Sequence, residues 1–289
     1  MTVLEVIQRS TEFLARKGVE SPRLHVELLL AHVLKMPRLQ LYLNFERTLT
    51  AQELETLRAL VKRRGEREPL QHILGSISFC GLEIFVNRHV LVPRPETEIL
   101  AEAGWRFLSG LPAIPAWPPL ALDFGTGSGC IAVALAANAP ASRVQALDIS
   151  EAALLVAREN AERNGLTERI EFVCAADFKG LASDLRFDLI ISNPPYIPST
   201  EIDALAPEVR DFDPRLALDG GEDGLRFYRQ IAVEAAERLK PGGRVMLEFG
   251  DGQAALVERI FVETGWLIEA IEKDLTGRLR ILIARRQEA

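Results

Sequence analysis

The sequence predicts an α/β protein in two parts: a small N-terminal helical bundle and a larger domain with a mostly parallel, seven-stranded sheet and an antiparallel last strand. Apolar residues recur at helical spacing until about residue 65, and from Gly75 the period changes to two. Strand-like and helix-like segments then alternate, which is typical of a parallel sheet with helices on both faces. We therefore expect domains at 1–74 and 93–289, joined by a β-hairpin at 75–92.

The N-terminal segment has the start signals and the periodicity of a helical bundle. Thr2 with Glu5, and Thr50 with Glu53, have the spacing of capping boxes, and Ser21 before Pro22 has the pattern of an N-cap. No titratable cluster stands out here, so we interpret the segment as a recognition or docking module, although packing alone accounts for every residue in it. Its apolar positions at helical spacing are Val3, Val6, Ile7, Val26, Leu29, Leu30, Val33, Leu54, Leu57, Leu60 and Val61.

The segment that joins the two domains is expected to form a hairpin at 77–86 that turns at Cys80-Gly81. A proline-stiffened entry at 92–98 leads into a helix with acidic residues in its first turn, and the Pro/Ala-rich stretch 111–119 is a loop. Only 274–277 separate the last two strands, so we expect them to form an antiparallel hairpin. The expected strands are 120–124, 144–148, 170–174, 187–192, 243–249, 267–271 and 280–284, and the expected helices are 130–138, 151–164, 225–239 and 253–264.

Composition indicates an ordinary globular protein. Of the 289 residues, 48% are hydrophobic and 26% charged. No apolar run approaches the ~20 residues that span a membrane, and the N-terminus lacks a signal-peptide core, so we expect a cytoplasmic protein without membrane association. Cys80, Cys130 and Cys174 lack metal-ligand spacing and are interpreted as buried thiols in a reducing compartment, with no metal site. The absence of sustained heptads predicts a monomer.

The net charge of −7 is unevenly distributed. Residues 1–75 hold 12 Lys+Arg and 9 Asp+Glu, whereas the remainder holds 22 and 32. Duplex nucleic acid is gripped mainly by Lys and Arg that neutralise phosphates. The acidic larger domain therefore argues against stable nucleic-acid binding.

A chemical motif follows the strand-like run 187–192, where two prolines end the strand at Asn193-Pro194-Pro195-Tyr196. In open α/β sheets, ligands bind at this carboxyl end of the strands. The Asn193 side-chain oxygen and the Pro194 carbonyl can accept both N–H groups of a planar NH2, and Tyr196 can stack on its plane. Taken alone, these four residues fit a capped turn better, so the interpretation depends on its context.

The context is a glycine-rich loop, Gly125-Thr126-Gly127-Ser128-Gly129, between the first core strand and its helix. Its spacing is G-x-G-x-G, with Cys130 where a dinucleotide fingerprint has its third glycine. Asp148 ends the second strand, where an acid can hold ribose hydroxyls. Asp177 follows the third strand, placed to accept from an adenine amine, with Phe178 beside it as an apolar wall. Each acid alone also fits a turn.

These residues carry a resemblance. The core is similar to class I S-adenosylmethionine-dependent methyltransferases, and Asn-Pro-Pro-Tyr resembles the motif of those that methylate planar NH2 groups. Over nearly its whole length, the chain resembles the peptide chain release factor N5-glutamine methyltransferases, the HemK/PrmC family. Besides the loop and Asn-Pro-Pro-Tyr, the matching segments are Glu-Pro-Leu-Gln-His-Ile-Leu-Gly at 68–75, Pro-Arg-Pro-Glu-Thr-Glu at 93–98 and Pro-Arg-Leu-Ala-Leu-Asp-Gly-Gly at 214–221.

The resemblance implies a Rossmann-like fold, the cofactor S-adenosyl-L-methionine, and methylation of the glutamine in the Gly-Gly-Gln motif of class 1 release factors, which the N-terminal domain docks. It implies catalytic roles for Asn193, Pro194 and Tyr196, which with Pro195 bind the substrate amide. The implied cofactor-binding residues are Gly125, Thr126, Gly127, Ser128, Gly129, Asp148, Asp177, Phe178 and Asn193.

Three alternatives remain. A nucleic-acid methyltransferase acting on adenine N6 or guanine N2 uses similar sites for a flipped base, but the acidic core disfavours it. A binding-only scaffold has no need of the loop, Asp148 and Asn193 together. The glycine spacing disfavours an NAD-linked oxidoreductase. The segment 219–224, Asp-Gly-Gly-Glu-Asp-Gly, lacks the ligand pattern of an EF-hand and is expected to be a loop near the site.

Overall fold

The computed structural model describes residues 1–112 and 117–287. Part of the predicted loop at 111–119, residues 113–116, lies outside the described residues. Contacts divide the chain into two compact units: Met1–Ser76 with Ala206–Phe212, and Ile77–Leu205 with Asp213–Ala289. The first unit therefore includes a short segment that lies far along the chain.

The first unit is helical, and both of its predicted capping boxes form. The Thr2 and Thr50 hydroxyls accept from the backbone N–H of Glu5 and Glu53, whose carboxylates accept from the threonine N–H groups. Ser21 precedes a helix as expected, but its backbone is left-handed (φ 47°) and its side chain makes no capping bond, so that part of the prediction is wrong. The helices are α1 (Val3–Arg16), α2 (Pro22–Leu34), α3 (Arg38–Tyr42), α4 (Ala51–Gly65), α5 (Leu70–Leu74) and α9 (Pro207–Arg210).

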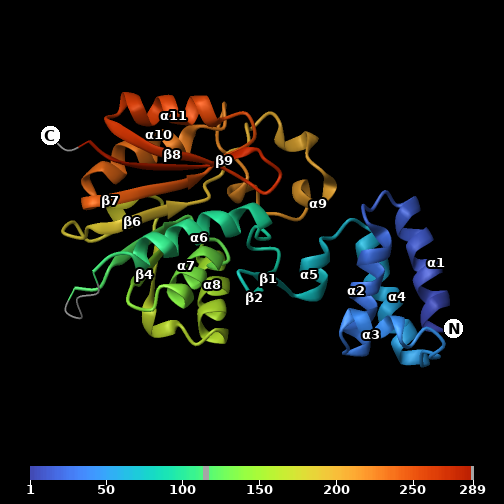
Figure 1. Ribbon diagram of the computed structural model, residues 1–289. Helices are drawn as coiled ribbons and strands as arrows, with labels where there is room; N and C mark the ends of the chain where they lie inside the picture. The colour runs from blue at the N-terminus through green and yellow to red at the C-terminus, as the bar shows by residue number, and fades with distance from the viewer. Residues whose placement is uncertain (113–116, 288–289) are drawn as a thin grey trace. The chain divides into compact units, whose positions relative to one another are not determined.

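The second unit is built on a seven-stranded sheet in the order β5-β4-β3-β6-β7-β9-β8 (Figure 1). Strands β3 to β7 pair in parallel, and β9 is antiparallel to both of its neighbours. This confirms the predicted sheet with its antiparallel last strand. The strands are β3 (Leu120–Phe124), β4 (Arg143–Asp148), β5 (Ile170–Cys174), β6 (Phe187–Ser192), β7 (Leu239–Glu248), β8 (Trp266–Lys273) and β9 (Leu279–Arg286).

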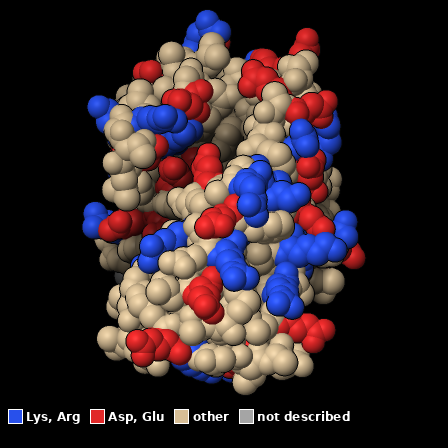
Figure 2. Space-filling view, turned by 90° about the vertical axis from the view of Figure 1, so that its right-hand side faces the viewer, with Lys and Arg blue, Asp and Glu red and all other residues tan. Residues whose placement is uncertain are grey.

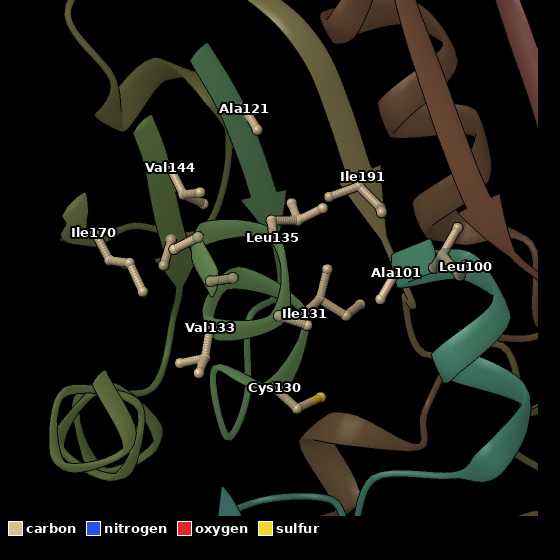
Figure 3. Close-up of a cluster of buried hydrophobic side chains, with 14 of the residues drawn as sticks. Leu100, Ala101, Ala121, Cys130, Ile131, Val133, Leu135, Val144, Ile170 and Ile191 are labelled. Carbon is tan, nitrogen blue, oxygen red and sulfur yellow. The ribbon is translucent and has the colours of Figure 1, made fainter. Parts of the chain in front are cut away.

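The helices cover both faces of this sheet, with α6, α7 and α8 on one face and α10 and α11 on the other (Figure 1). Side chains of β3 alternate between the two cores: Ala121 packs toward the first face and Leu122 toward the second. Figure 3 shows the first core, where Ile131 and Leu135 lie between the strands and Ala101. The helices are α6 (Pro95–Ser109), α7 (Cys130–Asn138), α8 (Glu151–Arg163), α10 (Arg226–Glu234) and α11 (Ala254–Glu263).

Two further expectations need correction. The helix expected at 225–239 is shorter, because the chain passes through a 3-10 turn (Ala235–Glu237) and β7 already begins at Leu239. Pro241 in that strand cannot donate to a helix, which explains the early end. Of the three cysteines only Cys130 is buried; Cys80 is half-buried and Cys174, at the end of edge strand β5, is exposed.

None of the described helices is long and apolar enough to cross a membrane.

A two-stranded hairpin, β1 (Ser76–Phe79) and β2 (Leu82–Phe85), stands where it was expected. Cys80 and Gly81 both have positive φ (51° and 77°), as a two-residue turn between strands of right-handed twist requires. Asn160 of α8 fixes the hairpin by bonding both the N–H and the carbonyl of Phe85. The chain continues from the hairpin into the segment that precedes α6.

Candidate active site

A pocket lies at the carboxyl ends of the parallel strands of the second unit. Successive strand ends supply it with the glycine loop after β3, Leu147 to Ser150 at β4, Ala175 and Ala176 after β5, and Asn193 to Pro195 after β6. Two further segments close it: His89 to Thr97 before and in α6, and Pro214 to Ala217. The order of strands therefore gathers residues that the chain keeps far apart.

The glycine loop is held in a fixed conformation. Gly125, Gly127 and Gly129 have φ of 74°, 54° and 77°, values that side chains rarely adopt. A Cβ on Gly129 would also lie 2.9 Å from the Cβ of Ala157, so α8 packs directly against the loop. Asp123, near the end of β3, also holds the loop, because its Oδ2 accepts from the Thr126 hydroxyl at 2.6 Å. Burial raises the pKa of Asp123 to about 7.

Asp148 connects the loop to the end of β4. Its Oδ2 accepts from the Gly127 N–H at 2.8 Å, and its Oδ1 accepts from the Ser150 N–H at 2.9 Å. Burial raises the pKa of Asp148, and these backbone bonds oppose the shift. Each carboxylate oxygen keeps a lone pair beyond its backbone bond, so Asp148 can accept further hydrogen bonds from a diol in the pocket.

Asn193 is linked to a buried carboxylate. Its Nδ2 donates to Thr97 Oγ1 at 3.1 Å, and the Thr97 hydroxyl donates to Glu248 Oε2 at 2.7 Å. Thr97 and Glu248 are each 2% exposed. Burial raises the pKa of Glu248 to about 7, and the nearby Glu96 carboxylate adds to the shift.

Tyr196 is tied to the 219–224 segment and to α11 by its backbone. The next residue, Ile197, bridges to Asp219, and the Gln253 side chain donates to the Tyr196 carbonyl at 2.9 Å. Gly220 donates back to the Ile197 carbonyl at 2.9 Å. The segment that was expected to be a loop near the site therefore packs against Asn-Pro-Pro-Tyr itself. Burial raises the pKa of Tyr196 to about 12, so its phenol stays neutral.

An ion pair joins the two segments that close the pocket. Arg94 Nη2 lies 2.9 Å from Asp213 Oδ2. Asp213 is 6% exposed, and burial raises its pKa to about 6 although the Arg94 guanidinium opposes the shift. Arg94 belongs to the 93–98 segment and Asp213 precedes the 214–221 segment, so these two distant stretches meet at the pocket.

Comparison with known proteins shows which family the chain belongs to. Residues 5–75 match the model of the PrmC N-terminal domain, and residues 108–208 match the methyltransferase small domain. A protein from Geobacter sulfurreducens named release factor glutamine methyltransferase is 45% identical over 98% of this chain and 96% of its own. The chain belongs to the release factor glutamine methyltransferase family. A second family member, from Chlorobaculum tepidum, is 45% identical over 90% of this chain and 89% of its own.

Solved structures show that the fold of this family member is that of class I methyltransferases. A Pyrococcus furiosus methyltransferase is 24% identical, with a TM-score of 0.50, and covers 71% of this chain and 88% of its own. The N-terminal domain of human METTL16, solved in complex with SAH, is 17% identical, with a TM-score of 0.51, and covers 84% of this chain and 86% of its own. At these identities the likeness concerns the fold alone.

The structure brings most of the predicted site residues of this family member together. Those that line the pocket are Gly125, Thr126, Gly127, Ser128, Asp148, Asn193, Pro194 and Pro195. Gly129, Asp177, Phe178 and Tyr196 are not among the lining residues. Asp177 instead caps a 3-10 turn by accepting from the Lys179 N–H. Phe178 is 2% exposed and stacks on Phe124 at 4.9 Å between ring centroids.

The interpretation of Phe178 as an apolar wall beside the ligand is therefore not supported, because its ring fills the core under the loop. Ala175 and Ala176 line that part of the pocket instead. Sequence reasoning also missed Thr97, which was explained as part of a helix start, and Glu248, which ends an apolar strand. The available signal for Glu248 was a charged residue at the carboxyl end of a strand. The described residues contain no cluster of three or more metal-ligating side chains.

Proposed function

We propose that this protein transfers the methyl group of S-adenosyl-L-methionine to the side-chain amide nitrogen, N5, of the glutamine in the Gly-Gly-Gln motif of class 1 peptide chain release factors. The products are N5-methylglutamine and S-adenosyl-L-homocysteine. One observation carries the proposal: the pocket of this family member places Asn193 and Pro194 beside the glycine loop, to which Asp148 at the end of β4 is hydrogen-bonded. The relatives named release factor glutamine methyltransferase support the choice of substrate.

The residues of the pocket fit the cofactor. Gly125 and Gly127 have open space where a Cβ would stand, so a ligand can approach their backbone closely. Asp148 has acceptor capacity for the hydroxyls of a ribose. Bound S-adenosyl-L-methionine supplies a methyl group that its sulfonium already activates, so the reaction needs no nucleophilic side chain from the protein.

The task of the protein is to orient a weak nucleophile. An amide nitrogen is a poor nucleophile because its lone pair is delocalised into the carbonyl. Asn193 Oδ1 and the Pro194 carbonyl accept the two N–H groups of the substrate amide and aim its nitrogen. Pro194 is buried and lacks an N–H, so its backbone is stiff and offers only an acceptor. Apolar lining residues, such as Leu91 and Phe227, exclude water.

We assign docking of the release factor to the first unit, whose sequence matches the PrmC N-terminal domain. Two of its leucines, Leu39 and Leu43, are 73% and 85% exposed and are available for contact with a protein. On the face shown in Figure 2, Lys and Arg side chains are interspersed with Asp and Glu. Such a mixture suits a protein partner better than a nucleic-acid backbone. We also expect the enzyme to act as a cytoplasmic monomer.

The product identifies the reaction. Release factor is incubated with the enzyme and S-adenosyl-L-methionine, digested, and sequenced by fragment mass spectrometry. We expect one added methyl group on the side chain of the Gly-Gly-Gln glutamine. Methylation at another residue, or none on the factor, would reject the proposed substrate.

A further inference from the structure

While Glu248 is ionised and can only accept, a chain of hydrogen bonds beside the pocket has one possible direction. Asn193, Thr97 and Glu248 come from the end of β6, the first turn of α6 and the end of β7. A hydroxyl has a single hydrogen, and the Thr97 hydroxyl gives it to Glu248 Oε2. Toward Asn193, the Thr97 oxygen can therefore only accept.

The direction of this chain determines which end of the Asn193 amide faces the ligand. Only the Nδ2 end of an amide can donate, and it does so to Thr97 Oγ1 at 3.1 Å. With Nδ2 directed at Thr97, Oδ1 is the end of the amide that remains for a ligand in the pocket.

Glu248 itself is held in place by the fold. Its strand, β7, lies between β6 and β9 in the sheet. The Tyr228 hydroxyl of α10 donates to the Glu248 carbonyl at 2.9 Å. These contacts fix the backbone of Glu248, and its buried carboxylate is held by the bond from Thr97, so the network favours one orientation of the amide over the other.

We propose that Thr97 and Glu248 are positioning residues, which hold the Asn193 amide with its nitrogen inward and its oxygen toward the substrate. The inference rests on the proposed function, because only a substrate with an NH2 group needs an acceptor at this point. A flipped Asn193 would present its own NH2 to the substrate NH2, and the two donors would repel each other. Thr97 would thus position Asn193 in addition to forming part of the first turn of α6.

The test compares three variants of the full-length enzyme. Thr97→Val keeps the shape of the side chain and removes both hydrogen bonds, whereas Thr97→Ser keeps the hydroxyl. Ser142→Ala is the matched control, because it removes another buried hydroxyl bond, to the Ala139 carbonyl at 2.8 Å. Ser142 lies just before the start of β4, whereas the pocket lies at the carboxyl ends of the strands. For each variant we would measure kcat, KM, cofactor affinity by calorimetry, and solvent exchange of the Asn193 side-chain amide by NMR.

We expect Thr97→Val to lower kcat by about 10- to 100-fold, and Thr97→Ser to stay within about threefold of the wild type. Cofactor affinity should change by less than about twofold in both, and Ser142→Ala should leave kcat unchanged. The Asn193 amide hydrogens should exchange faster in Thr97→Val than in the wild type.

Two results would overturn the proposal: an unchanged kcat and exchange rate in Thr97→Val, or an equal loss of kcat in Thr97→Ser, which would indicate packing. Failure of the proposed function has a different outcome. In that case the wild-type enzyme would leave the release factor unmethylated, while the exchange rate would still report whether Thr97 holds the amide.

Discussion

A Cβ atom on Gly224 would lie 2.3 Å from the carbonyl oxygen of Tyr196. The backbone of the 219–224 segment thus touches the backbone of Asn-Pro-Pro-Tyr with no room for a side chain. Gly220 makes a similar approach, since its Cβ would lie 2.8 Å from the carbonyl oxygen of Pro195. The glycines of this segment therefore allow it to pack against the residues that orient the substrate.

Gly224→Ala should therefore damage the reaction more than the fold. The added methyl group must push Tyr196 and its neighbours away, and we expect kcat to fall by about tenfold or more. Gly277→Ala is the control, because Gly277 also has a positive φ (88°) but has open space where its Cβ would stand. Steady-state kinetics and thermal unfolding of both variants separate the two effects. Equal kcat values would show that the contact with Tyr196 does not matter.

Asn193→Ala should lower the rate of methyl transfer by about 100-fold, because the substrate amide loses the acceptor that aims it. Cofactor affinity should change much less, since the loop and Asp148 are untouched. Single-turnover kinetics and calorimetry measure the two quantities separately. Near-normal turnover in this variant would disprove the role of Asn193 as an amide clamp.

Asp148→Ala should weaken binding of S-adenosyl-L-methionine by about 10- to 100-fold, because charged hydrogen bonds to the ribose are lost. Loss of the Gly127 N–H bond also loosens the loop. At saturating cofactor, kcat should recover in large part. Asp184→Ala, at an exposed aspartate, serves as the control. Unchanged affinity in calorimetry would rule out the ribose role.

The pH dependence of kcat should report the ionisation of Glu248, whose pKa burial raises to about 7. The ionised form accepts from Thr97 and holds Asn193, so kcat should rise as pH increases through about 7. Of the charged groups nearby, Glu96 raises this pKa and Arg280 lowers it. In Glu248→Gln the rise should disappear. A wild-type profile that is flat between pH 6 and about 8, or a rise that persists in Glu248→Gln, would contradict the assignment.

The contribution of Glu248 to the free energy of unfolding should change in the opposite direction to kcat, falling as pH rises. The folded pKa of Glu248 lies above its ordinary value, so the folded state favours the protonated form. Its contribution to the free energy of unfolding is fully present below the ordinary pKa of a glutamate and is lost as pH rises through about 7. Asp123 titrates in the same range, so the wild type is compared with Glu248→Gln by urea unfolding at each pH.

Glu208→Ala should release the segment Ala206–Phe212 from the helical unit to which it belongs. Glu208 bonds Arg64 at 2.7 Å and Arg67 at 2.6 Å, and the Arg64 side chain is only 4% exposed. Loss of its partner leaves a buried cation, at a cost of about 3 kcal/mol. Urea unfolding and proteolysis of the segment measure the effect, with exposed Glu201→Ala as control. Unchanged protection would contradict the assignment.

The same ion pairs should make this unit sensitive to acid. Burial raises the pKa of Glu208, but hydrogen bonds from Arg67 and Arg64 outweigh that effect and lower it to about 2. A lowered pKa contributes stability above the ordinary pKa of a glutamate, and this contribution is lost as pH falls toward about 2. His25 accepts from Arg64 Nε at 3.1 Å; burial and the Arg64 charge lower its pKa to about 4, so it is neutral at pH 7.

The fold could be predicted from sequence because its signals are local. The alternation of apolar strands with helices identified the sheet, and a short separation between the last two strands indicated their antiparallel pairing. The end of α10 was misplaced because apolar periodicity continues to Leu239, although Pro241 and the glycines after it disfavour a helix.

The site could be predicted only where a motif marks it. The glycine loop and Asn193 each follow a strand, and parallel strands bring such ends together. The bonds from Thr97 to Glu248, and from Arg94 to Asp213, join residues 151 and 119 positions apart, and no local pattern reveals such pairs. Position after a strand can also mislead. Phe178 follows β5 and was expected to line the pocket, but its ring stacks on Phe124 in the adjacent core.

The central claim is that this enzyme methylates glutamine in a release factor. The most direct measurement is transfer of labelled methyl from S-adenosyl-L-methionine to purified release factor, to its Gln→Ala variant at the Gly-Gly-Gln motif, and to DNA and ribosomal RNA in parallel. We predict label on the wild-type factor alone. Label on nucleic acid, with none on the factor, would mean that the pocket holds a base and would contradict the account.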